Sequence, residues 1–151
     1  QLTGLGDVCA QYHGGCLVKL RPGDPLAAEA LSVDDGVALH YRYFSQIRTR
    51  DILADPIRRQ AINQAADVAL AELGDLASQA KVDMATTIEI SRRFAQDSGL
   101  LAHEEVIRSI AEVEESGGAA SMIMLGNAVY STLPFTGSSP TALSTRAVEY
   151  I

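Results

Sequence analysis

The residues whose types and spacing could do chemistry lie at the start of the chain. Asp7 follows the glycine turn of residues 4–6 and precedes a helix-compatible run, residues 8–13, which ends at Gly14 and Gly15. A carboxylate here is stabilised by the free N–H groups and the positive end of a short helix, which favours a capping role. A carboxylate on such a turn could also accept a proton from a substrate hydroxyl, or orient that hydroxyl toward a phosphate. The spacing leaves both roles open.

Other side chains with chemical potential are fewer and do not converge. His13 stands alone before the glycine turn, and no Ser-His-Asp order supports a hydrolase, so His13 is expected to be structural. The acidic residues within 104–115 fit a solvated helix face rather than a metal site. Cys9 and Cys16 complete no zinc pattern and are expected to be free thiols in a reducing compartment. We therefore predict no metal site formed by the protein.

Composition bounds the class of protein. The chain has 151 residues, enough for one domain, or for most of one domain and a piece of another. It has 47% hydrophobic residues but no run of about 18 apolar residues, so a soluble protein without a transmembrane helix is expected. The net charge of −7 argues against nucleic-acid binding, which needs clustered Lys and Arg. The chain has no signal-peptide pattern and opens on Gln1, and we expect a cytoplasmic fragment of a longer protein.

The strands that would position these residues are predicted from short apolar runs between turn signals. They are expected over residues 16–20 and 36–44, and these two are expected to pair. Between them, residues 26–32 are predicted to be a helical turn or loop. Residues 119–132 are strand-like on both sides of a break at 125–127.

Helices are predicted where apolar residues recur at helical spacing between a cap and a stop. Their ranges are 55–80, 83–98, 103–116 and 139–151. Asp55 with Pro56 marks the start of the first, and Gly99 ends the second. In the third, the apolar residues expected to face inward are Val106, Ile107, Ile110 and Val113. This order of elements predicts an α+β fold in which helices pack on a small antiparallel sheet, as in ferredoxin-like folds.

Three stretches together resemble the GHMP family of small-molecule kinases. In residues 4–15, Asp7 stands at the same distance from Gly14 and Gly15 as the acid of the family's substrate-side motif. The other two are residues 94–100 and residues 120–130, the last of which contain the run Met-Leu-Gly-Asn. These are most similar to the archaeal pantoate kinase branch of the family. Together the three stretches cover much of the chain.

The resemblance implies ATP-dependent phosphorylation of pantoate to 4-phosphopantoate on the archaeal route to coenzyme A. It implies ATP and Mg²⁺ as cofactors, pantoate as the small-molecule partner, and Asp7 as the catalytic residue that orients or deprotonates the hydroxyl. Phosphoryl transfer needs positioning and charge stabilisation more than covalent help, which suits a single carboxylate. The implied substrate-binding residues are Gly6, Lys19, Gly126 and Asn127.

Two of these residues have alternative interpretations. Pantoate carries a carboxylate and so needs a cation, and Lys19 leaves the glycine turn on the strand nearest to Asp7. Arg21 and Arg42 are rivals, and a lysine on a strand is commonly a solvated surface residue. Gly126 either contacts substrate or phosphate, or allows close backbone packing beside the cleft.

The sequence departs from the family pattern in two places. The Gly/Ser-rich loop that holds the ATP phosphates should lie upstream of Asp7, and an acid after Gly4-Leu5-Gly6 would repel phosphates. The late glycine-rich motif keeps one glycine, Gly126. We therefore predict that the chain is inactive alone, with residues 1–50 ending an N-terminal substrate-side domain and residues 51–151 forming a C-terminal α+β domain.

Two other functions stay open at this point. One is a non-catalytic ferredoxin-like module that binds or senses a small ligand. The other is a GHMP kinase for a different small alcohol, such as mevalonate or homoserine. Neither nucleic acid nor a membrane is expected as a partner, and apolar surface exposed without the N-terminal part could lead to a homo-oligomer.

Overall fold

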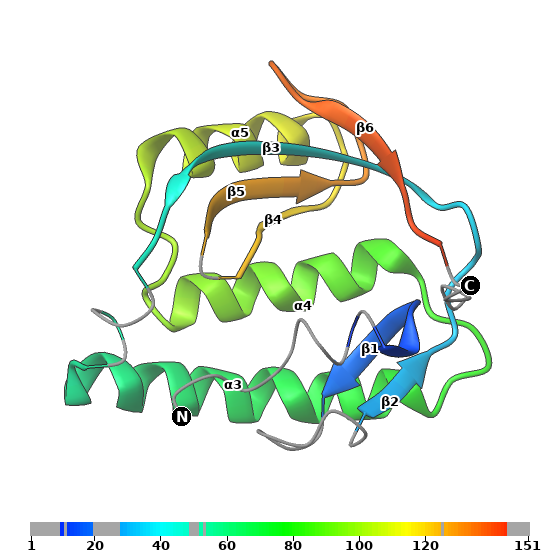
Figure 1. Cartoon of the computed structure of the whole chain (residues 1–151), viewed down its shortest axis with the longest axis horizontal. Helices are drawn as coiled ribbons and strands as arrows, with labels where there is room; N and C mark the ends of the chain where they lie inside the picture. Colours follow the sequence, from blue (N-terminus) through cyan, green and yellow to red (C-terminus); the bar gives the residue numbers. More distant parts are fainter. Residues whose placement is uncertain are drawn as a thin grey trace.

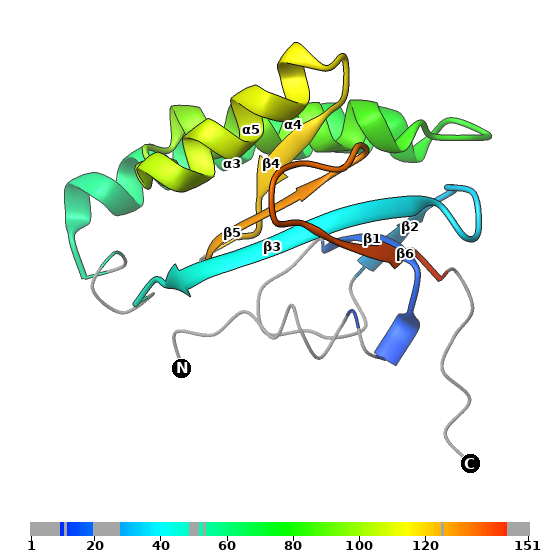
Figure 2. The ribbon, with the colours of Figure 1, turned by 90° about the horizontal axis from the view of Figure 1, so that it is seen from above.

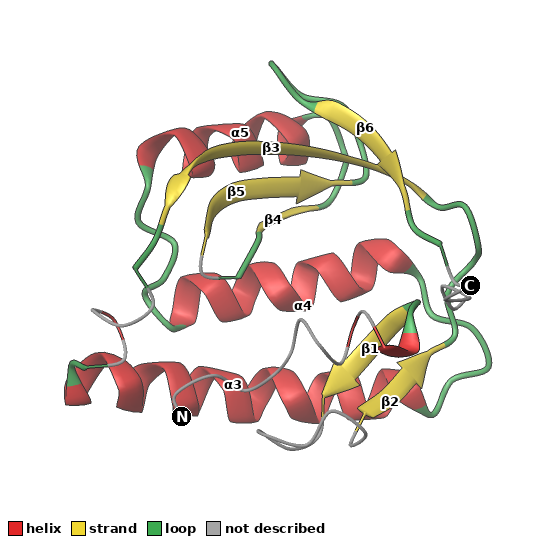
Figure 3. Cartoon of the chain, in the orientation of Figure 1, coloured by secondary structure: helices red, strands yellow, loops and turns green. Residues whose placement is uncertain are grey.

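The computed structural model describes residues 10, 12–19, 28–48, 52, 54–124 and 126–144. Its helices and strands are β1 (Cys16–Lys19), β2 (Ala28–Leu31), β3 (Ala38–Gln46), α3 (Pro56–Ala77), α4 (Met84–Asp97), α5 (Glu104–Glu115), β4 (Ala120–Met122), β5 (Gly126–Ser131) and β6 (Ser139–Ala142). The three helices lie side by side on one side of the strands (Figure 1, Figure 2, Figure 3). The predicted α+β fold, with helices on antiparallel sheets, is confirmed.

The larger sheet has four strands in the order β4-β5-β3-β6, and every neighbouring pair is antiparallel. Within it, Tyr43 of β3 is paired with Ala128 of β5, and a bulge follows at Phe44. On its other edge β3 pairs with β6. This sheet therefore joins strands from both sides of residue 51, and the domain boundary expected there stays a prediction.

The predicted pairing of the first two strands is wrong. β1 pairs with β2, in the register Cys16 to Leu31 and Lys19 to Ala28, and not with β3. The segment 26–32, expected to be a helical turn or loop, thus contains a strand. Its residues are good helix formers, but propensity is a weak prior that tertiary contacts override. The contact here is burial of Leu31 together with Val18 of β1 and Val82.

The predicted helix over 139–151 is also wrong where the structure describes it. Residues 139–142 form β6, and residues 145–151 lie outside the described residues. Ser139-Pro140 is typical of a helix start, but proline also suits a strand at the edge of a sheet, where its missing N–H breaks no ladder. β6 is such an edge strand, with Pro140 opposite His40.

The three central helices are confirmed, and their caps explain their starts. The Asp55 carboxylate accepts hydrogen bonds from the backbone N–H groups of Ile57 and Arg58 at 2.9 and 3.3 Å. The Asp83 carboxylate accepts one from Thr86 N–H at 3.2 Å at the start of α4. Gly99 follows α4 with a φ of 71°, a left-handed conformation that glycine adopts without strain.

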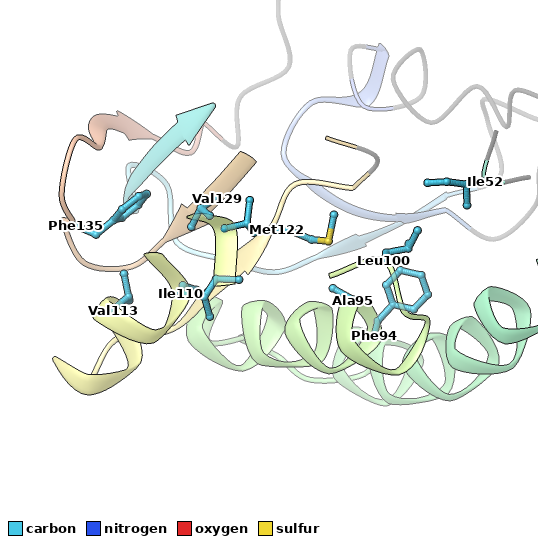
Figure 4. Packing of buried hydrophobic residues seen from close by; sticks show 11 residues of the cluster. Ile52, Phe94, Ala95, Leu100, Ile110, Val113, Met122, Val129 and Phe135 are labelled. Atoms are coloured by element: carbon cyan, nitrogen blue, oxygen red, sulfur yellow. The ribbon is translucent and has the colours of Figure 1, made fainter. Parts of the chain in front are cut away.

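The main core lies between the four-stranded sheet and helices α4 and α5 (Figure 4). Ile110 and Val113 of α5 and Val129 of β5 are fully buried there. Ile107, expected to face inward, is 42% exposed, which corrects that prediction. Val106, Ile110 and Val113 are spaced four and three residues apart and already fill the face toward the sheet, so Ile107 lies beside that face.

Helix α3 packs differently from the other two. None of its residues is buried, and Ile57 and Val68 are 81% and 60% exposed. It packs mainly against α4 and the β1–β2 hairpin, and its Ala65, Ala66 and Ala69 also contact the main core (Figure 1). An ion pair between Glu72 of α3 and Arg93 of α4 joins the two helices.

Candidate functional site

The glycine turn next to the predicted acid is described, but the acid itself is not. Asp7 and Gly6 lie outside the described residues. The backbone N–H of Gly14 donates to the carbonyl of Ala10 at 2.9 Å, and Gly14 and Gly15 have φ values of 66° and 72°. Two successive residues in the left-handed region require glycine and end the preceding helical turn. The role of Asp7 stays a prediction.

Lys19, the predicted substrate-binding cation, is the last residue of β1. It pairs with Ala28 of β2, and its side chain is partly buried. Its neighbour Val18 points the other way, into the small core with Leu31. Lys19 therefore lies on the face of the hairpin opposite that core.

Arg42, a rival cation, is occupied by contacts within the protein. Its Nη1 donates a hydrogen bond to the Thr136 carbonyl at 2.8 Å. Its guanidinium carbon lies 4.6 Å from the centre of the Phe44 ring, a cation–π distance. These contacts favour a structural role for Arg42. Arg21, the other rival, lies outside the described residues.

Of the Met-Leu-Gly-Asn run, Met124 lies between β4 and β5, and Gly126 and Asn127 begin β5. The N–H of Gly126 donates to the Ile123 carbonyl at 3.0 Å. A Cβ at Gly126 would approach only the Ile123 oxygen among described atoms, at 3.8 Å, which is ordinary contact. Close backbone packing therefore does not explain this glycine within the described residues. Asn127 follows, and its Nδ2 donates to Oγ of Ser45 in β3 at 2.8 Å.

The predicted site residues fall into two regions. A pocket of about 390 Å³ borders Gly14 and Gly15 and is lined by residues of the β1–β2 hairpin and its flanks. Asn127 lines a different pocket, at the opposite end of the molecule, and the two pockets share no described residue. In Figure 1, β1 lies toward the lower right and β5 begins at the left. The described residues thus do not bring Lys19 and Asn127 into one pocket.

The pocket at Asn127, which we name the α3 pocket, has a volume of about 770 Å³. Its walls come from the end of β3 and the residues after it, the first two turns of α3, the loop between α4 and α5, and Asn127 of β5. Its polar wall includes Arg48, Arg58 and His103, none of which the sequence singles out. They are far apart in the chain and form no motif, so no sequence signal groups them.

Two ionisable side chains, Tyr130 and Cys16, are partly buried against the cluster of Met84, Ile88 and Ala119. Burial raises the pKa of the Tyr130 phenol. Its hydrogen bonds to the Ser91 and Ser121 side chains lower the pKa by a smaller amount. Burial also raises the pKa of the Cys16 thiol, which is free, as predicted. A thiol whose pKa is raised is a poor nucleophile at neutral pH. Burial therefore argues against a nucleophilic role for Cys16.

The described ranges contain neither a cluster of metal ligands nor a membrane-spanning helix. In these ranges no group of three or more His, Cys, Asp or Glu side chains could hold a metal ion. None of the helices described there combines the length and apolar character needed to cross a bilayer.

Comparisons with known proteins identify relatives of this chain. No protein-family model matches it. The pantoate kinase of Methanocaldococcus jannaschii is 33% identical over 128 residues, covering 85% of this chain and 45% of that protein. The pantoate kinase of Thermococcus kodakarensis is 28% identical over 142 residues, covering 84% of this chain and 41% of that protein.

A solved structure, named as a phosphotransferase related to the CoA biosynthesis pathway, matches with a TM-score of 0.71. The match covers 93% of this chain and 49% of that one, at 22% identity, and shows a shared fold. The chain spans less than half the length of each of these relatives. The resemblance predicted from the sequence is confirmed: the chain is a homologue of the archaeal pantoate kinases.

Proposed function

We propose that the protein containing this chain is a kinase of coenzyme A biosynthesis that phosphorylates pantoate to 4-phosphopantoate with ATP. The observation that carries this proposal is the sequence identity to the pantoate kinase of Methanocaldococcus jannaschii. The Thermococcus kodakarensis relative and the fold shared with a CoA-pathway phosphotransferase support it. Because the chain spans less than half of these proteins, the activity is assigned to the whole protein.

In this proposal Asp7 orients or deprotonates the acceptor hydroxyl, and Lys19 holds the pantoate carboxylate. The rival Arg42 binds the Thr136 carbonyl and stacks on Phe44, which favours a structural role for that side chain. Gly6, Gly126 and Asn127 are the other proposed substrate contacts, although the described residues place Lys19 and Asn127 in no common pocket. Mg²⁺ would bind with the nucleotide, where it would offset the charge of the phosphates.

The test uses the complete protein and separates chemistry from capping at Asp7. Asparagine caps a helix about as well as aspartate but cannot accept a proton. Asp7→Asn should therefore keep the melting temperature and lower ADP release with pantoate by about a hundredfold or more. The matched control is Asp83→Asn, because Asp83 caps α4 and has no proposed role in the chemistry. It should keep both properties.

Wild-type turnover in Asp7→Asn would remove Asp7 from the catalytic role. A panel of acceptors tests the substrate: turnover with mevalonate or homoserine but not pantoate would change the acceptor. Pantoate binding without any ADP release in the complete protein would favour a binding module. The 151-residue chain by itself is expected to release no ADP, and turnover by it would contradict the division of the site proposed above.

A further inference from the structure

Tyr130 lies on the face of the four-stranded sheet that α5 does not cover. Successive side chains of a strand point to opposite faces, and Val129, the residue before it in β5, is fully buried in the main core with α5. Tyr130 packs instead on the second cluster, formed by Met84, Ile88 and Ala119. The phenol therefore has surroundings of its own, apart from those of the main core.

The hydroxyl of Tyr130 joins two elements. It forms hydrogen bonds with the side chains of Ser91 in α4 and Ser121 in β4. Ser121 is also the direct ladder partner of Tyr130, and it is fully buried. A phenylalanine would fill nearly the same space, so the hydroxyl contributes a fixed position rather than volume. With two partners, the ring cannot turn or slide without breaking a hydrogen bond in a largely buried place.

The residue of β1 that lies close to this ring is Cys16. Figure 2 shows β1 on the side of the sheet away from α5, and Cys16 packs against the same cluster as Tyr130. Burial is the main cause that raises the pKa of the Tyr130 phenol, and the charge of a Cys16 thiolate would raise it further, so the two groups are near each other. Cys16 directly follows Gly14 and Gly15 and lines the same pocket. The strand start beside the glycine turn therefore rests near the Tyr130 ring.

The glycine turn depends on its neighbours for its position. Gly14 and Gly15 have no side chains that could pack, and Gly14 is held by the bond from its N–H to the Ala10 carbonyl. On the adjoining strand end, the Ser32 carbonyl accepts a hydrogen bond from Val82 N–H at 2.7 Å. A backbone bond thus fixes the end of β2. The start of β1 is fixed through the packing of its first side chain.

We infer that Tyr130 is a positioning residue for the glycine turn: by holding Cys16 in place, it fixes Gly14 and Gly15 and the segment before them that carries Asp7. This inference rests on the proposed function, in which Asp7 acts on the acceptor hydroxyl. Tyr130 takes no part in the chemistry itself. It acts through the place of the acid, and a displacement of about 1 Å can slow a reaction about a hundredfold.

The first test observes the turn directly and needs no turnover. Tyr130→Phe in the 151-residue chain removes the hydroxyl and keeps the ring, so a changed amide signal reports movement rather than a lost ring current. We expect the amide signals of Gly14 and Gly15 to shift in NMR spectra, and that of Gly117, beyond the end of α5, to stay in place. Tyr43→Phe is the matched control, because the Tyr43 ring is 63% exposed. It should move none of these signals.

The second test measures kcat and KM in the complete protein. Tyr130→Phe should lower kcat with pantoate by about tenfold, because the acid is misplaced, and should leave KM for ATP within about twofold. Ser91→Ala removes one of the two partners of the phenol and should lower kcat by a smaller factor. It also serves as the second variant if Tyr130→Phe does not fold. Tyr43→Phe should leave kcat unchanged.

A double mutant separates positioning from a general structural effect. In an Asp7→Asn background, Tyr130→Phe should lower turnover by less than about twofold, because a displaced side chain that no longer accepts a proton has little activity left to lose. Equal losses in the wild-type and Asp7→Asn backgrounds would overturn the inference, since Tyr130 would then act independently of Asp7.

Unchanged Gly14 and Gly15 signals in both Tyr130→Phe and Ser91→Ala would also overturn it, whatever the protein catalyses. Absence of pantoate kinase activity, or wild-type turnover in Asp7→Asn, would instead refute the proposed function, and the NMR signals would still decide whether Tyr130 holds the turn. Circular dichroism and thermal unfolding of each variant check that its fold is intact.

Discussion

Asn127 donates a hydrogen bond from Nδ2 to Oγ of Ser45 at 2.8 Å and so joins the start of β5 to β3. The two residues are direct partners in the antiparallel ladder. They lie next to the bulge at Phe44, whose ring meets His103 in the α3 pocket. One polar contact therefore holds the hairpin and one wall of that pocket together.

Removing the acceptor should loosen this arrangement. Ser45→Ala leaves the Asn127 amide without its partner, and we expect the free energy of unfolding to fall by about 1 kcal/mol. In the complete protein the KM for pantoate should rise as well, because Asn127 is no longer held. Ser78→Ala, which removes an exposed hydroxyl bonded to the Asp75 carbonyl, is the control and should leave KM unchanged.

Unchanged KM in both Ser45→Ala and Asn127→Ala would remove Asn127 from the substrate site. Urea denaturation of the same variants gives their stabilities, so an effect on binding is not confused with partial unfolding.

The two proven caps calibrate the interpretation of Asp7. Asp55→Ala should lower the free energy of unfolding by about 1 kcal/mol, because two backbone N–H groups of α3 lose their acceptor. Asp55→Asn should cost a few tenths at most, since asparagine caps equally well. The ion pair with Arg58 is exposed and adds little.

Denaturant melts of the two Asp55 variants check this difference. If Asn costs as much as Ala at Asp55, the charge matters more than the cap. Asp7→Asn would then no longer separate chemistry from capping, and its effect on turnover would need a different control.

Two glycines in contrasting surroundings give a packing prediction. A Cβ at Gly118 would lie 2.8 Å from the Leu133 side chain and 2.8 Å from Cγ1 of Val113. Gly118→Ala should therefore overpack the core and destabilise the fold by about 1–3 kcal/mol. Gly74 in α3 has no described atom within 4 Å of a Cβ, and Gly74→Ala should stabilise by up to about 1 kcal/mol.

The signs of these two changes are the test, and thermal unfolding of both variants measures them. An unchanged stability of Gly118→Ala would show that the Leu133 and Val113 side chains move away from the new Cβ without cost.

Stability should fall at alkaline pH because of the buried phenol and thiol. Burial raises the pKa of Tyr130 above its ordinary value of 10.0 and the pKa of Cys16 above 9.0. Between the unfolded and the folded pKa, the folded state binds more protons than the unfolded chain. The stabilisation is thus complete below the ordinary values and is lost as pH rises above them toward the raised ones.

The free energy of unfolding should therefore decline between about pH 8 and pH 11, and Tyr130→Phe should flatten the upper part of this decline. Tyr43→Phe is the control, because Tyr43 is 63% exposed. An equal slope in the wild type and Tyr130→Phe would contradict the role of Tyr130. Tyr130→Phe also loses the bonds to Ser91 and Ser121, so the slope and not the absolute stability is compared.

The helices could be predicted from the sequence because their start signals are local. Asp55 and Asp83 each cap the backbone within three residues, and Gly99 ends α4 at the next turn. Strands β2 and β6 could not, because their four residues have no strand signal of their own. They are strands because β1 and β3 offer them a partner, and that pairing is a property of the tertiary fold.

The candidate site residues likewise include some that the sequence predicts and some that it does not. The acid, the paired glycines and the Met-Leu-Gly-Asn run lie in short motifs, and a resemblance to known kinases finds them. The α3 pocket has no such motif, because Arg48, Arg58 and His103 come from three separate segments. Their proximity depends on how the end of β3, the start of α3 and the loop before α5 pack together. The spacing of apolar residues along the chain does not specify that packing.

The position of β3 has a consequence for how this region folds during synthesis. It pairs on one side with β5 and on the other with β6, and both of these strands follow α3, α4 and α5 in the chain. The helices can form while the ribosome is still adding residues, but β3 must wait for partners made much later. Such distant pairing is slow, because the entropy of closing a long loop is lost before any contact forms. Until β5 emerges, the apolar faces of α4 and α5 have no sheet to cover them, and a chaperone would find its binding surface there.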